Sequence, residues 1–374
     1  MNRPVSPASL IPRCGVEVTA ASLPKPELVD TPEQLTPSWL TAALRVGGLD
    51  VTVSDVSFSP VGTGQMSSCY RLTVGYSQGE GPASLVAKLP IADPDARASS
   101  ALGSLTEVRF YRELRSTVAI RTPECVYANA DQEGMSFVLL LEDLAPAAQG
   151  DQIAGCGAAQ AQDAVVNLAG LHGPRWCDNS LRHLDLLTPM GASNAAGIAA
   201  LLEQMTEGFL ERFSVSDSER QVLRAFAQGA TGWLLGRTER FGLVHGDYRL
   251  DNLTFATPRG GYPCAAVDWP LLSVGLPARD LGFFLGTCMD PVERAANDDA
   301  LVAAYHAALL RHGVGGYSLD ECFEDYRWGL FQGPLITVLG AMFAPPTERG
   351  DRMFATMSHR CCAALRDLDS LSLL

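Results

Sequence analysis

Between residues 51 and 89, hydrophobic and polar positions alternate with a period of two, as they do in half-buried strands. The pattern predicts three consecutive strands, over residues 51–58, 69–74 and 84–89. Because glycine-rich turns join these strands, we expect an antiparallel meander rather than a βαβ unit.

The segments before and after these strands have other patterns. Residues 1–31 are rich in proline, serine and leucine without a clear period, which indicates an extended arm. Thr36 is a suitable N-cap and Pro37 a suitable first helical residue, and together they predict a short helix over residues 38–46. Beyond the three strands, hydrophobic spacing predicts one helix and two more strands, over residues 105–115, 125–130 and 135–141.

The character of the chain changes after residue 144, where helical spacing dominates. Short strand-like pieces interrupt it only around a polar loop in residues 241–268. Strands first and helices later are typical of an α+β protein, here with two lobes joined near residue 143. We therefore divide the chain into an arm with a short helix (1–50), a sheet lobe (51–143) and a helical lobe (144–374). The expected helices of the last part cover residues 159–171, 195–213, 218–237, 292–311, 319–341 and 349–365.

Composition and charge exclude several classes of protein. The chain has 374 residues, 28 Lys plus Arg against 42 Asp plus Glu, and a net charge of −14; its only lysines are Lys25 and Lys88. An acidic chain without a run of positive charge is poorly suited to nucleic acid. With 47% apolar residues it can bury a full core and is neither disordered nor fibrous.

Signals for export and for membranes are missing from the sequence pattern. Residues 1–20 contain no continuous apolar stretch like that of a signal peptide, and the densest apolar run, Phe137 to Leu141, is too short to cross a bilayer. The ten cysteines are scattered apart from Cys361 and Cys362, so we expect reduced, mostly buried side chains. These observations predict a soluble, cytoplasmic protein with no membrane partner, and they leave its oligomeric state open.

A short glycine-containing turn, Gly62-Thr63-Gly64, lies between the first two expected strands. A dinucleotide-binding turn would need a third glycine at position 67 and a helix after it, whereas Ser67 leads into a strand. The turn is therefore either an ordinary hairpin or a flap whose backbone N–H groups lie over phosphates.

Lys88 stands in an apolar strand, where an ammonium is costly to bury without a charge partner. It could be an edge-strand lysine whose tip reaches water. Because the chain uses arginine almost everywhere else, however, a lysine kept mid-strand suggests a task for a compact ammonium. Glu107, on the next expected helix, is the natural counter-charge, although it could equally lie on a solvated helix face.

The densest group of polar residues runs from His245 to Asn252, between two short hydrophobic strands. Asp247 and Asn252 are five residues apart on this loop, and a strand holds the loop at each side, so the two side chains can converge on one point. A carboxylate there can accept or orient the proton of a hydroxyl group, and an amide oxygen is a hard ligand suited to Mg²⁺.

Asp268 ends a buried strand, sixteen residues after Asn252. A carboxylate in this position usually either caps backbone groups or binds a cation. Together with Asn252 it would supply the second oxygen ligand for a metal that bridges the phosphates of ATP.

In their order and spacing, these features resemble the aminoglycoside phosphotransferase and choline kinase-like family of small-molecule kinases. The resemblance covers roughly residues 55–345 and rests on Gly62-Thr63-Gly64, Lys88, Glu107, Asp247, Asn252 and Asp268. The run His-Gly-Asp-Tyr-Arg-Leu-Asp-Asn is similar to a subgroup that includes the ecdysteroid kinase-like proteins and the kinases associated with acyl-CoA dehydrogenases.

The resemblance implies a two-lobed α+β fold of the protein-kinase type and a role for each residue. Lys88 would contact the α- and β-phosphates of ATP and pair with Glu107. Asp247 would be the catalytic base or would orient the hydroxyl group. Asn252 and Asp268 would hold Mg²⁺ on the phosphates.

The resemblance also implies two backbone contacts with the nucleotide. The Gly62-Thr63-Gly64 turn would cover the phosphates. The main chain from Glu142 to Leu144 would form hydrogen bonds with the edge of the adenine ring.

Four other residues have roles that the resemblance suggests but does not decide. Arg249 would neutralise charge on the transferring phosphoryl group, or would instead form a salt bridge to Asp251 or at the lobe interface. Asp280 and His245 are interpreted as braces of the loop, and His172 as a helix-end histidine with satisfied hydrogen bonds.

The expected activity is therefore Mg²⁺-dependent transfer of the γ-phosphoryl group of ATP to a hydroxyl group of a small molecule. An aminoglycoside-like acceptor fits the acidic charge, and a lipophilic or hydroxyacyl alcohol fits the aromatic late helices. Five residues there either line the acceptor site or belong to the helix core: Tyr326, Trp328, Phe331, Gln332 and Met342. The alternative is a nucleotide-binding pseudokinase or scaffold protein without turnover.

Overall fold

The computed structural model describes residues 25–62, 67–185, 187 and 190–374, and the chain falls into two compact units. Most of the expected N-terminal arm, residues 1–24, lies outside the described residues. Unit 1 comprises the chain up to Thr117, Thr122–Ala145 and Asp268–Pro270; unit 2 comprises Val118–Arg121, Pro146–Val267 and Leu271–Leu374.

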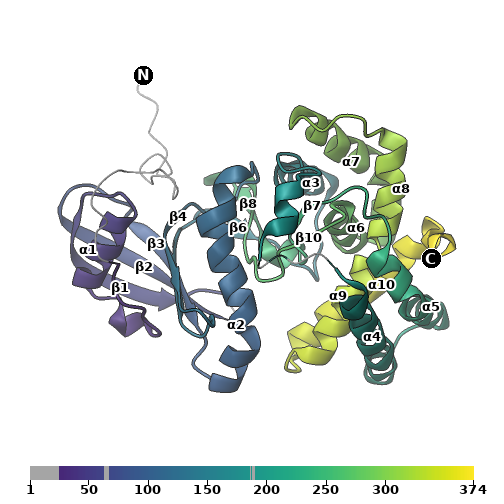
Figure 1. Cartoon of the computed structure of the whole chain (residues 1–374), viewed down its shortest axis with the longest axis horizontal. Coiled ribbons are helices and arrows are strands. Elements are labelled where there is room, and N and C mark those ends of the chain that lie inside the picture. Colours follow the sequence, from purple (N-terminus) through teal and green to yellow (C-terminus); the bar gives the residue numbers. More distant parts are fainter. Residues whose placement is uncertain (1–24, 63–66, 186, 188–189) are drawn as a thin grey trace. The chain divides into compact units, whose positions relative to one another are not determined.

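Unit 1 is built on a five-stranded antiparallel sheet (Figure 1). Its first three strands, β1 (Thr52–Pro60), β2 (Ser67–Gln78) and β3 (Ser84–Pro90), form the expected antiparallel meander. Strand β5 (Phe137–Glu142) pairs with β3, and β4 (Cys125–Ala130) completes the order β1-β2-β3-β5-β4. Strand β3 is therefore an inner strand of the sheet.

Helix α1 (Pro37–Val46) begins where the sequence predicts. The hydroxyl group of Thr36 accepts a hydrogen bond from the N–H of Trp39 at 3.3 Å, and Pro37 occupies the first helical position. The buried face of α1, which includes Trp39 and Leu40, packs against β1 and β4 and shares the core of unit 1 with side chains of β2, β3 and β5.

Helix α2 begins earlier than the predicted range of 105–115. It spans Pro94–Arg109 and continues as a π-helix over Phe110–Leu114. Its start is fixed by Asp93, whose carboxylate accepts a hydrogen bond from the N–H of Ala96 at 2.9 Å. Because the first turns consist mostly of small residues without an apolar period, hydrophobic spacing does not reveal them.

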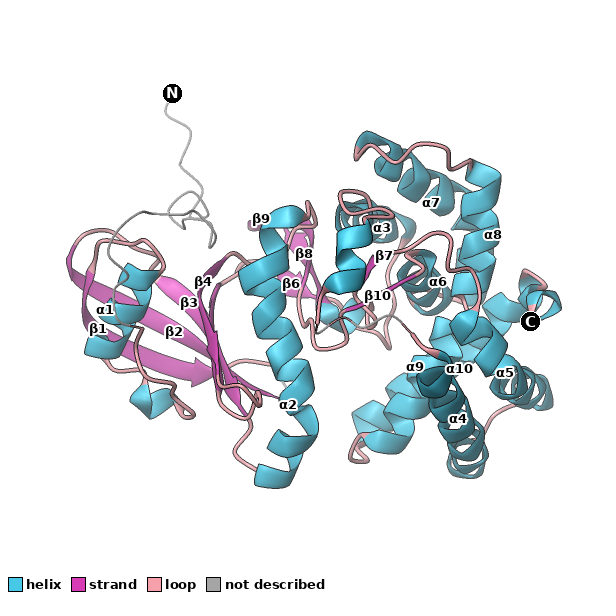
Figure 2. Cartoon of the chain, viewed as in Figure 1, coloured by secondary structure: helices cyan, strands magenta, loops and turns pink. Residues whose placement is uncertain are grey.

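Unit 2 is mainly helical, as expected for the second part of an α+β chain (Figure 2). The predicted helix over residues 319–341 is in fact two helices, α8 (Leu319–Gly329) and α9 (Gln332–Phe343), because Pro334 has no N–H with which to continue the hydrogen bonds of α8. The other predicted helices are confirmed: α3 (Ala158–His172), α4 (Ala192–Arg212), α5 (Asp217–Leu235), α7 (Pro291–Arg311) and α10 (Glu348–Asp367).

Helix α6 (Ala278–Thr287) was not predicted. All of its residues except Arg279 are buried, so the helix has no polar face that would give the sequence a helical period. It carries Asp280 within its first turn.

Short strands flank the polar loop of unit 2. Strand β7 (Gly242–Val244) precedes the loop and pairs with β10 (Ser273–Gly275), and a 3₁₀ turn, Leu250–Asn252, ends it. The sheet that follows has the order β6 (Ala148–Gln149), β8 (Leu253–Thr257), β9 (Gly260–Ala266). We refer to the segment between β7 and β8 as the 245–252 loop.

Two expectations concern the chain as a whole. The nine cysteines that the structure describes are free, which confirms the expected reduced state for them. Within the described residues, no helix combines the length and the apolar character needed to cross a bilayer.

Candidate functional site

Lys88 lies at the centre of a cluster of charges in unit 1. Its Nζ atom is 2.6 Å from Oε2 of Glu107 and 2.6 Å from Oδ1 of Asp268. Because Lys88 is on the inner strand β3 and only 8% exposed, it is not an edge-strand lysine that reaches water. Glu107 is 2% exposed, so it does not lie on a solvated helix face.

The surroundings of Lys88 keep its ammonium charged. Burial alone would lower the pKa of Lys88, because it disfavours the charged form. The carboxylates of Asp268 and Glu107 outweigh burial and raise the pKa well above its ordinary value. Burial also raises the pKa of Glu107 above its ordinary value, and the ammonium of Lys88 opposes this shift.

Asp268 adopts a backbone conformation that is rare for a residue with a side chain. Its φ of 70° lies in the left-handed region, and such strain is usually kept at functional sites. The next residue holds it in place: the ring of Trp269 stacks on Phe110 with centroids 3.8 Å apart, and its Nε1 donates to Thr122 at 3.3 Å. The side chain of Asp268 is 42% exposed, so it can reach a ligand while it binds Lys88.

The described part of the glycine-containing turn ends at Gly62, whose backbone conformation favours glycine. Gly62 has a φ of 76°, which favours glycine, and a Cβ atom there would meet nothing within 4 Å. Strands β1 and β2 remain paired up to Val61, whose N–H donates to the carbonyl of Cys69 at 2.9 Å. Thr63 and Gly64 lie outside the described residues, so the phosphate flap stays a prediction.

The predicted adenine contacts fall at the end of β5. The N–H of Glu142 already donates to the carbonyl of Glu124 at 2.8 Å, and its carboxylate accepts the N–H of Glu124 at 3.1 Å. A contact of Glu142 with the base would therefore use its carbonyl group. Leu144 lies two residues beyond, and its contact also stays a prediction.

In unit 2, Asp280 fixes the first turn of the 245–252 loop. Its carboxylate accepts the N–H groups of His245 at 2.6 Å and of Gly246 at 2.9 Å, and Nε2 of His172 lies 3.2 Å away. Gly246 has a φ of 85°, and a Cβ atom there would lie 2.6 Å from the carbonyl oxygen of Leu271. The interpretation of Asp280 as a brace is confirmed.

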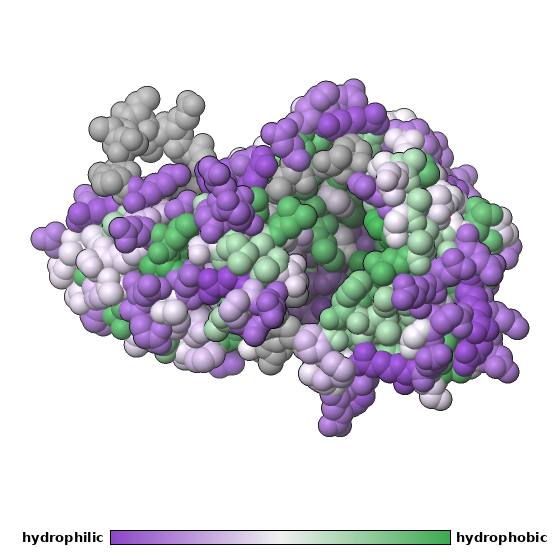
Figure 3. All heavy atoms as spheres, turned by 60° about the horizontal axis from the view of Figure 1, so that its bottom comes forward, coloured by the Kyte–Doolittle hydropathy of each residue, from purple (hydrophilic) through white to green (hydrophobic). Residues whose placement is uncertain are grey.

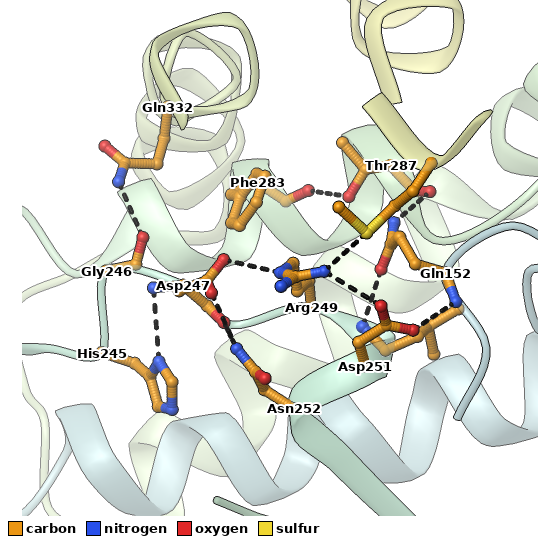
Figure 4. A network of polar contacts seen from close by, with 12 residues as sticks. Gln152, His245, Gly246, Asp247, Arg249, Asp251, Asn252, Phe283, Thr287 and Gln332 are labelled. Carbon is orange, nitrogen blue, oxygen red and sulfur yellow. Dashed lines mark hydrogen bonds and ion pairs between the residues drawn. The ribbon is translucent and has the colours of Figure 1, made fainter. Parts of the chain in front are cut away.

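His245 is a second brace of the loop. Its Nδ1 accepts the N–H of Asp247 at 3.3 Å, and its Nε2 lies 3.1 Å from the carbonyl oxygen of Val267. Both ring nitrogens therefore hold backbone groups, as expected for a structural residue; Figure 4 shows the bond with the N–H of Asp247.

Asp247 and Asn252 converge as the sequence predicts (Figure 4). The Nδ2 atom of Asn252 donates to Oδ2 of Asp247 at 2.8 Å and to its backbone carbonyl at 2.9 Å. The Nε atom of Arg249 donates to the other carboxylate oxygen, Oδ1, at 2.9 Å. Asp247 is thus held from two sides, and its direction is fixed.

Arg249 connects two carboxylates of the loop. Besides Asp247, it binds Oδ2 of Asp251 through Nη1 at 3.2 Å, so the salt bridge considered from the sequence is present. The same Nη1 lies 3.0 Å from the sulfur of Met353, on α10. Arg249 therefore lies beside Asp247, where the expected catalytic role requires it, and also forms the expected structural salt bridge with Asp251.

Sequence reasoning missed a group of residues around Asp251. Oδ1 of Asp251 accepts the N–H of Gln152 at 2.9 Å, and Arg349 binds both oxygens of Asp251 at 3.0 Å. Gln152 is fully buried and its Oε1 accepts the N–H of Leu250 at 2.8 Å. No local sequence pattern predicts these contacts, because the partners are about a hundred residues apart in the chain.

The donor atoms suit Mg²⁺ in their chemistry. Asn252 turns its amide nitrogen toward Asp247, which leaves Oδ1 as an acceptor, and the carboxylate of Asp268 is partly exposed. Within the described residues, no group of three or more His, Cys, Asp or Glu side chains could hold a metal. An amide oxygen and a carboxylate are each ligands that suit Mg²⁺, and the binding of one ion by both residues stays a prediction.

The aromatic candidates for the acceptor site belong mostly to the core. Tyr326 is fully buried and donates to Asp298 at 2.8 Å, and Phe331 is fully buried and stacks on Phe226. Gln332 is 2% exposed and donates to the carbonyl of Gly246 at 3.0 Å. The interpretation as helix-core residues is confirmed for these three, whereas Trp328 and Met342 are half-buried.

Comparison with protein families shows to which family the chain belongs. The model of the phosphotransferase enzyme family matches residues 67–317, which is more than half of the chain. The chain belongs to the phosphotransferase enzyme family. Most residues singled out above, from Lys88 to Asp280, lie inside the matched range of this family.

Solved structures similar to this phosphotransferase include three kinases. A GDP complex of wild-type aminoglycoside 2'-phosphotransferase-IIIa is 16% identical, with a TM-score of 0.53, and the match covers 83% of this chain and 94% of that one. Choline kinase from Cryptosporidium parvum Iowa II is 8% identical, with a TM-score of 0.54, covering 85% and 91%. Plasmodium vivax ethanolamine kinase is 10% identical, with a TM-score of 0.50, covering 84% of each chain.

At these identities the likeness establishes the fold, which is the expected two-lobed, kinase-like α+β fold. A comparison with curated protein sequences finds no match.

Asp280→Asn should destabilise this phosphotransferase by about 2–4 kcal/mol, because the amide would place N–H groups against the N–H groups of His245 and Gly246 in a buried site. Urea unfolding of the variant and the wild type measures the effect. A loss of stability below about 1 kcal/mol would show that the brace is unimportant.

Asp143, beside the predicted adenine contacts, should make the stability of unit 1 depend on pH. Burial acts to raise the pKa of Asp143, but hydrogen bonds from Arg71, Ser84 and Ala145 lower it below its ordinary value. Because the pKa is lower in the folded state, the carboxylate stabilises the protein above about pH 4 and loses its effect as the pH falls through the folded pKa.

Asp143→Asn should therefore lower the melting temperature at pH 7, and the difference from the wild type should shrink between about pH 5 and pH 3. Thermal unfolding across this range measures both proteins. A difference that stays constant with pH would contradict the expectation.

Proposed function

We propose that the protein is a kinase that transfers the γ-phosphoryl group of ATP to a hydroxyl group of a small molecule. The observation that carries the proposal is the buried ammonium of Lys88 between Glu107 and Asp268. This arrangement fixes the position of a compact positive charge, as the binding of α- and β-phosphates requires.

Asp247 is the residue that would act on the acceptor hydroxyl group. Arg249 and Asn252 hold its two oxygens, so the carboxylate can accept or orient a proton in one fixed direction. Positioning of this kind accounts for much of the catalysis of phosphoryl transfer. The guanidinium of Arg249, 2.9 Å from Asp247, would neutralise charge on the transferring group.

The remaining roles follow from the same chemistry. Mg²⁺ held by Asn252 and Asp268 would neutralise charge on the phosphate oxygens. Residues 51–143 would form the nucleotide-binding lobe, with the Gly62-Thr63-Gly64 turn over the phosphates and Glu142 to Leu144 at the adenine. Residues 144–374 would supply Asp247 and the acceptor site.

The surroundings of Arg249 favour a lipophilic alcohol over a polycationic aminoglycoside as acceptor. The two carboxylates in contact with Arg249 are already bound to arginine, whereas a polycation needs carboxylates that are not neutralised. On the face that Figure 3 presents, hydrophobic residues reach the surface of unit 2 among hydrophilic ones. Met353, which contacts Arg249, belongs to an apolar cluster with Phe283, Met357, Ile153, Ile336 and Phe354.

We also propose that the reaction takes place in the cytoplasm, because proteins with many free cysteines are typical of reducing compartments. The alternative function is nucleotide binding without turnover, as in a pseudokinase or scaffold. The presence of Asp247, Asn252 and Asp268 together argues against it, because a protein that only binds nucleotide does not need a hydroxyl-orienting carboxylate.

Release of ADP, measured with aminoglycosides, medium-chain alcohols and hydroxy acids, tests the proposal. At least one alcohol should raise ADP release by the wild type, and Asp247→Ala and Asp268→Ala should lower the acceptor-dependent rate by about 100-fold or more. Asp299→Ala, which removes an exposed carboxylate on α7, is the matched control and should be fully active.

If no acceptor raises ADP release above the level of the two inactive variants while ATP still binds with Mg²⁺, the protein is the non-catalytic nucleotide binder of the alternative.

Lys88→Arg should lower turnover at least about tenfold, because the longer, planar guanidinium cannot take the place of a compact ammonium 2.6 Å from both Glu107 and Asp268. Lys25→Arg changes the other lysine of the chain, which is exposed, and serves as the control. Steady-state kinetics with the best acceptor measures both; a fully active Lys88→Arg enzyme would show that the ammonium has no special role.

A further inference from the structure

Helix α10 presents one face to the 245–252 loop within unit 2. Arg349 and Met353 are four residues apart and therefore share a face of this helix. Arg349 binds Asp251, and the sulfur of Met353 lies 3.0 Å from Nη1 of Arg249. A helix close to the end of the chain thus contacts the two charged residues that follow Asp247.

The bond between Arg349 and Asp251 has the geometry of a specific contact. Nη1 of Arg349 lies 3.0 Å from Oδ2 of Asp251, and Nη2 lies 3.0 Å from Oδ1. Such bidentate pairs are the strongest that arginine forms with a carboxylate. The side chain of Asp251 is 11% exposed and that of Arg349 is 53% exposed, so the carboxylate belongs to the interior and the arginine reaches it from the surface.

The position of Arg349 in α10 indicates that its side chain serves the contact with Asp251. It is the second residue of α10, where the positive end of the helix dipole disfavours a cation. Asp251 supplies the compensating charge from another part of the chain. Asp151 also lies 3.8 Å from Nη2 of Arg349, but the shorter, bidentate contact is the one with Asp251 in the loop.

Asp251 is shared between two arginines. Its Oδ2 accepts hydrogen bonds from Nη1 of Arg349 at 3.0 Å and from Nη1 of Arg249 at 3.2 Å. Arg249 in turn binds Oδ1 of Asp247 through Nε at 2.9 Å. Arg249 thus lies between two carboxylates, and its place between them depends on what else binds Asp251.

We propose that Arg349 is a positioning residue for phosphoryl transfer: its bidentate bond to Asp251 limits the pull of this carboxylate on Arg249 and keeps Arg249 beside Asp247. The inference rests on the proposed function, in which Arg249 neutralises charge on the transferring group. It assigns to α10 the task of setting the geometry of the 245–252 loop.

Loss of Arg349 has a definite physical consequence. Asp251 would lose one of its two arginine partners and would attract Arg249 more strongly. A displacement of a catalytic group by about 1 Å can cost up to about 100-fold in rate. The affinity for nucleotide would change little, because the residues proposed to bind its phosphates, Lys88 and Asp268, belong to unit 1.

Kinetics of Arg349→Ala in the full chain tests the proposal. We expect kcat to fall about tenfold with KM for ATP within about twofold of the wild type. Arg349→Lys keeps the charge but not the bidentate geometry and should recover part of kcat. Arg352→Ala is the matched control, because Arg352 is an exposed arginine on the same helix with no ion pair among the residues that the structure describes; it should behave as the wild type.

Hydrogen exchange of the backbone amides of residues 247–253 provides a second measurement that requires neither acceptor nor turnover. Exchange should be faster in Arg349→Ala than in the wild type and in Arg352→Ala, with the melting temperature almost unchanged because the side chain is 53% exposed.

Unchanged exchange in the loop, or a kcat of Arg349→Ala within about twofold of the wild type, would overturn the inference and leave the proposed function intact. Absence of transfer to any acceptor by the wild type would instead overturn the proposed function. In that case the exchange measurement would still decide whether Arg349 orders the loop.

Discussion

The ammonium of Lys88, buried between the carboxylates of Glu107 and Asp268, is the interaction on which unit 1 depends. It connects the inner strand β3 with helix α2 and with the short segment that begins at Asp268. The pair of Lys88 and Glu107 is buried, and removal of one partner from such a pair typically costs about 3–5 kcal/mol, because an uncompensated charge remains. The left-handed backbone of Asp268 adds strain at the same place. An arrangement this costly is expected where a fixed positive charge is needed, as in the binding of phosphates.

In unit 2, charges are also paired, but around a loop rather than within a sheet. Asp280 accepts two backbone N–H groups at the start of the loop, Asp247 is held from two sides, and Asp251 is shared by Arg249 and Arg349. These bonds order the 245–252 loop through the protein's own side chains, and Figure 4 shows those around Asp247 and Arg249. Preorganisation of this kind is what phosphoryl transfer demands of a protein, because most of its catalysis is positioning and neutralisation of charge.

The sequence allowed prediction of the residues that stand out locally. Lys88 is one of two lysines, and Asp247 lies in the densest polar loop, so both could be found without a structure. Arg349 could not be predicted, because its proposed role depends on Asp251. The two residues are far apart in the sequence and lie close together only in the folded chain. The same limit applies to the fold: hydrophobic spacing gave most helices, yet it could not reveal α6, which is buried on almost all sides, or the break that Pro334 imposes.

The most direct test of the account follows the γ-phosphoryl group itself. The wild type is incubated with Mg²⁺, a panel of alcohols and ATP that carries ¹⁸O in the γ-phosphoryl group, and the acceptors are analysed by mass spectrometry. The account predicts an alcohol that has gained the labelled phosphoryl group. Label that appears only in inorganic phosphate, or that remains entirely in ATP with every acceptor, would contradict it.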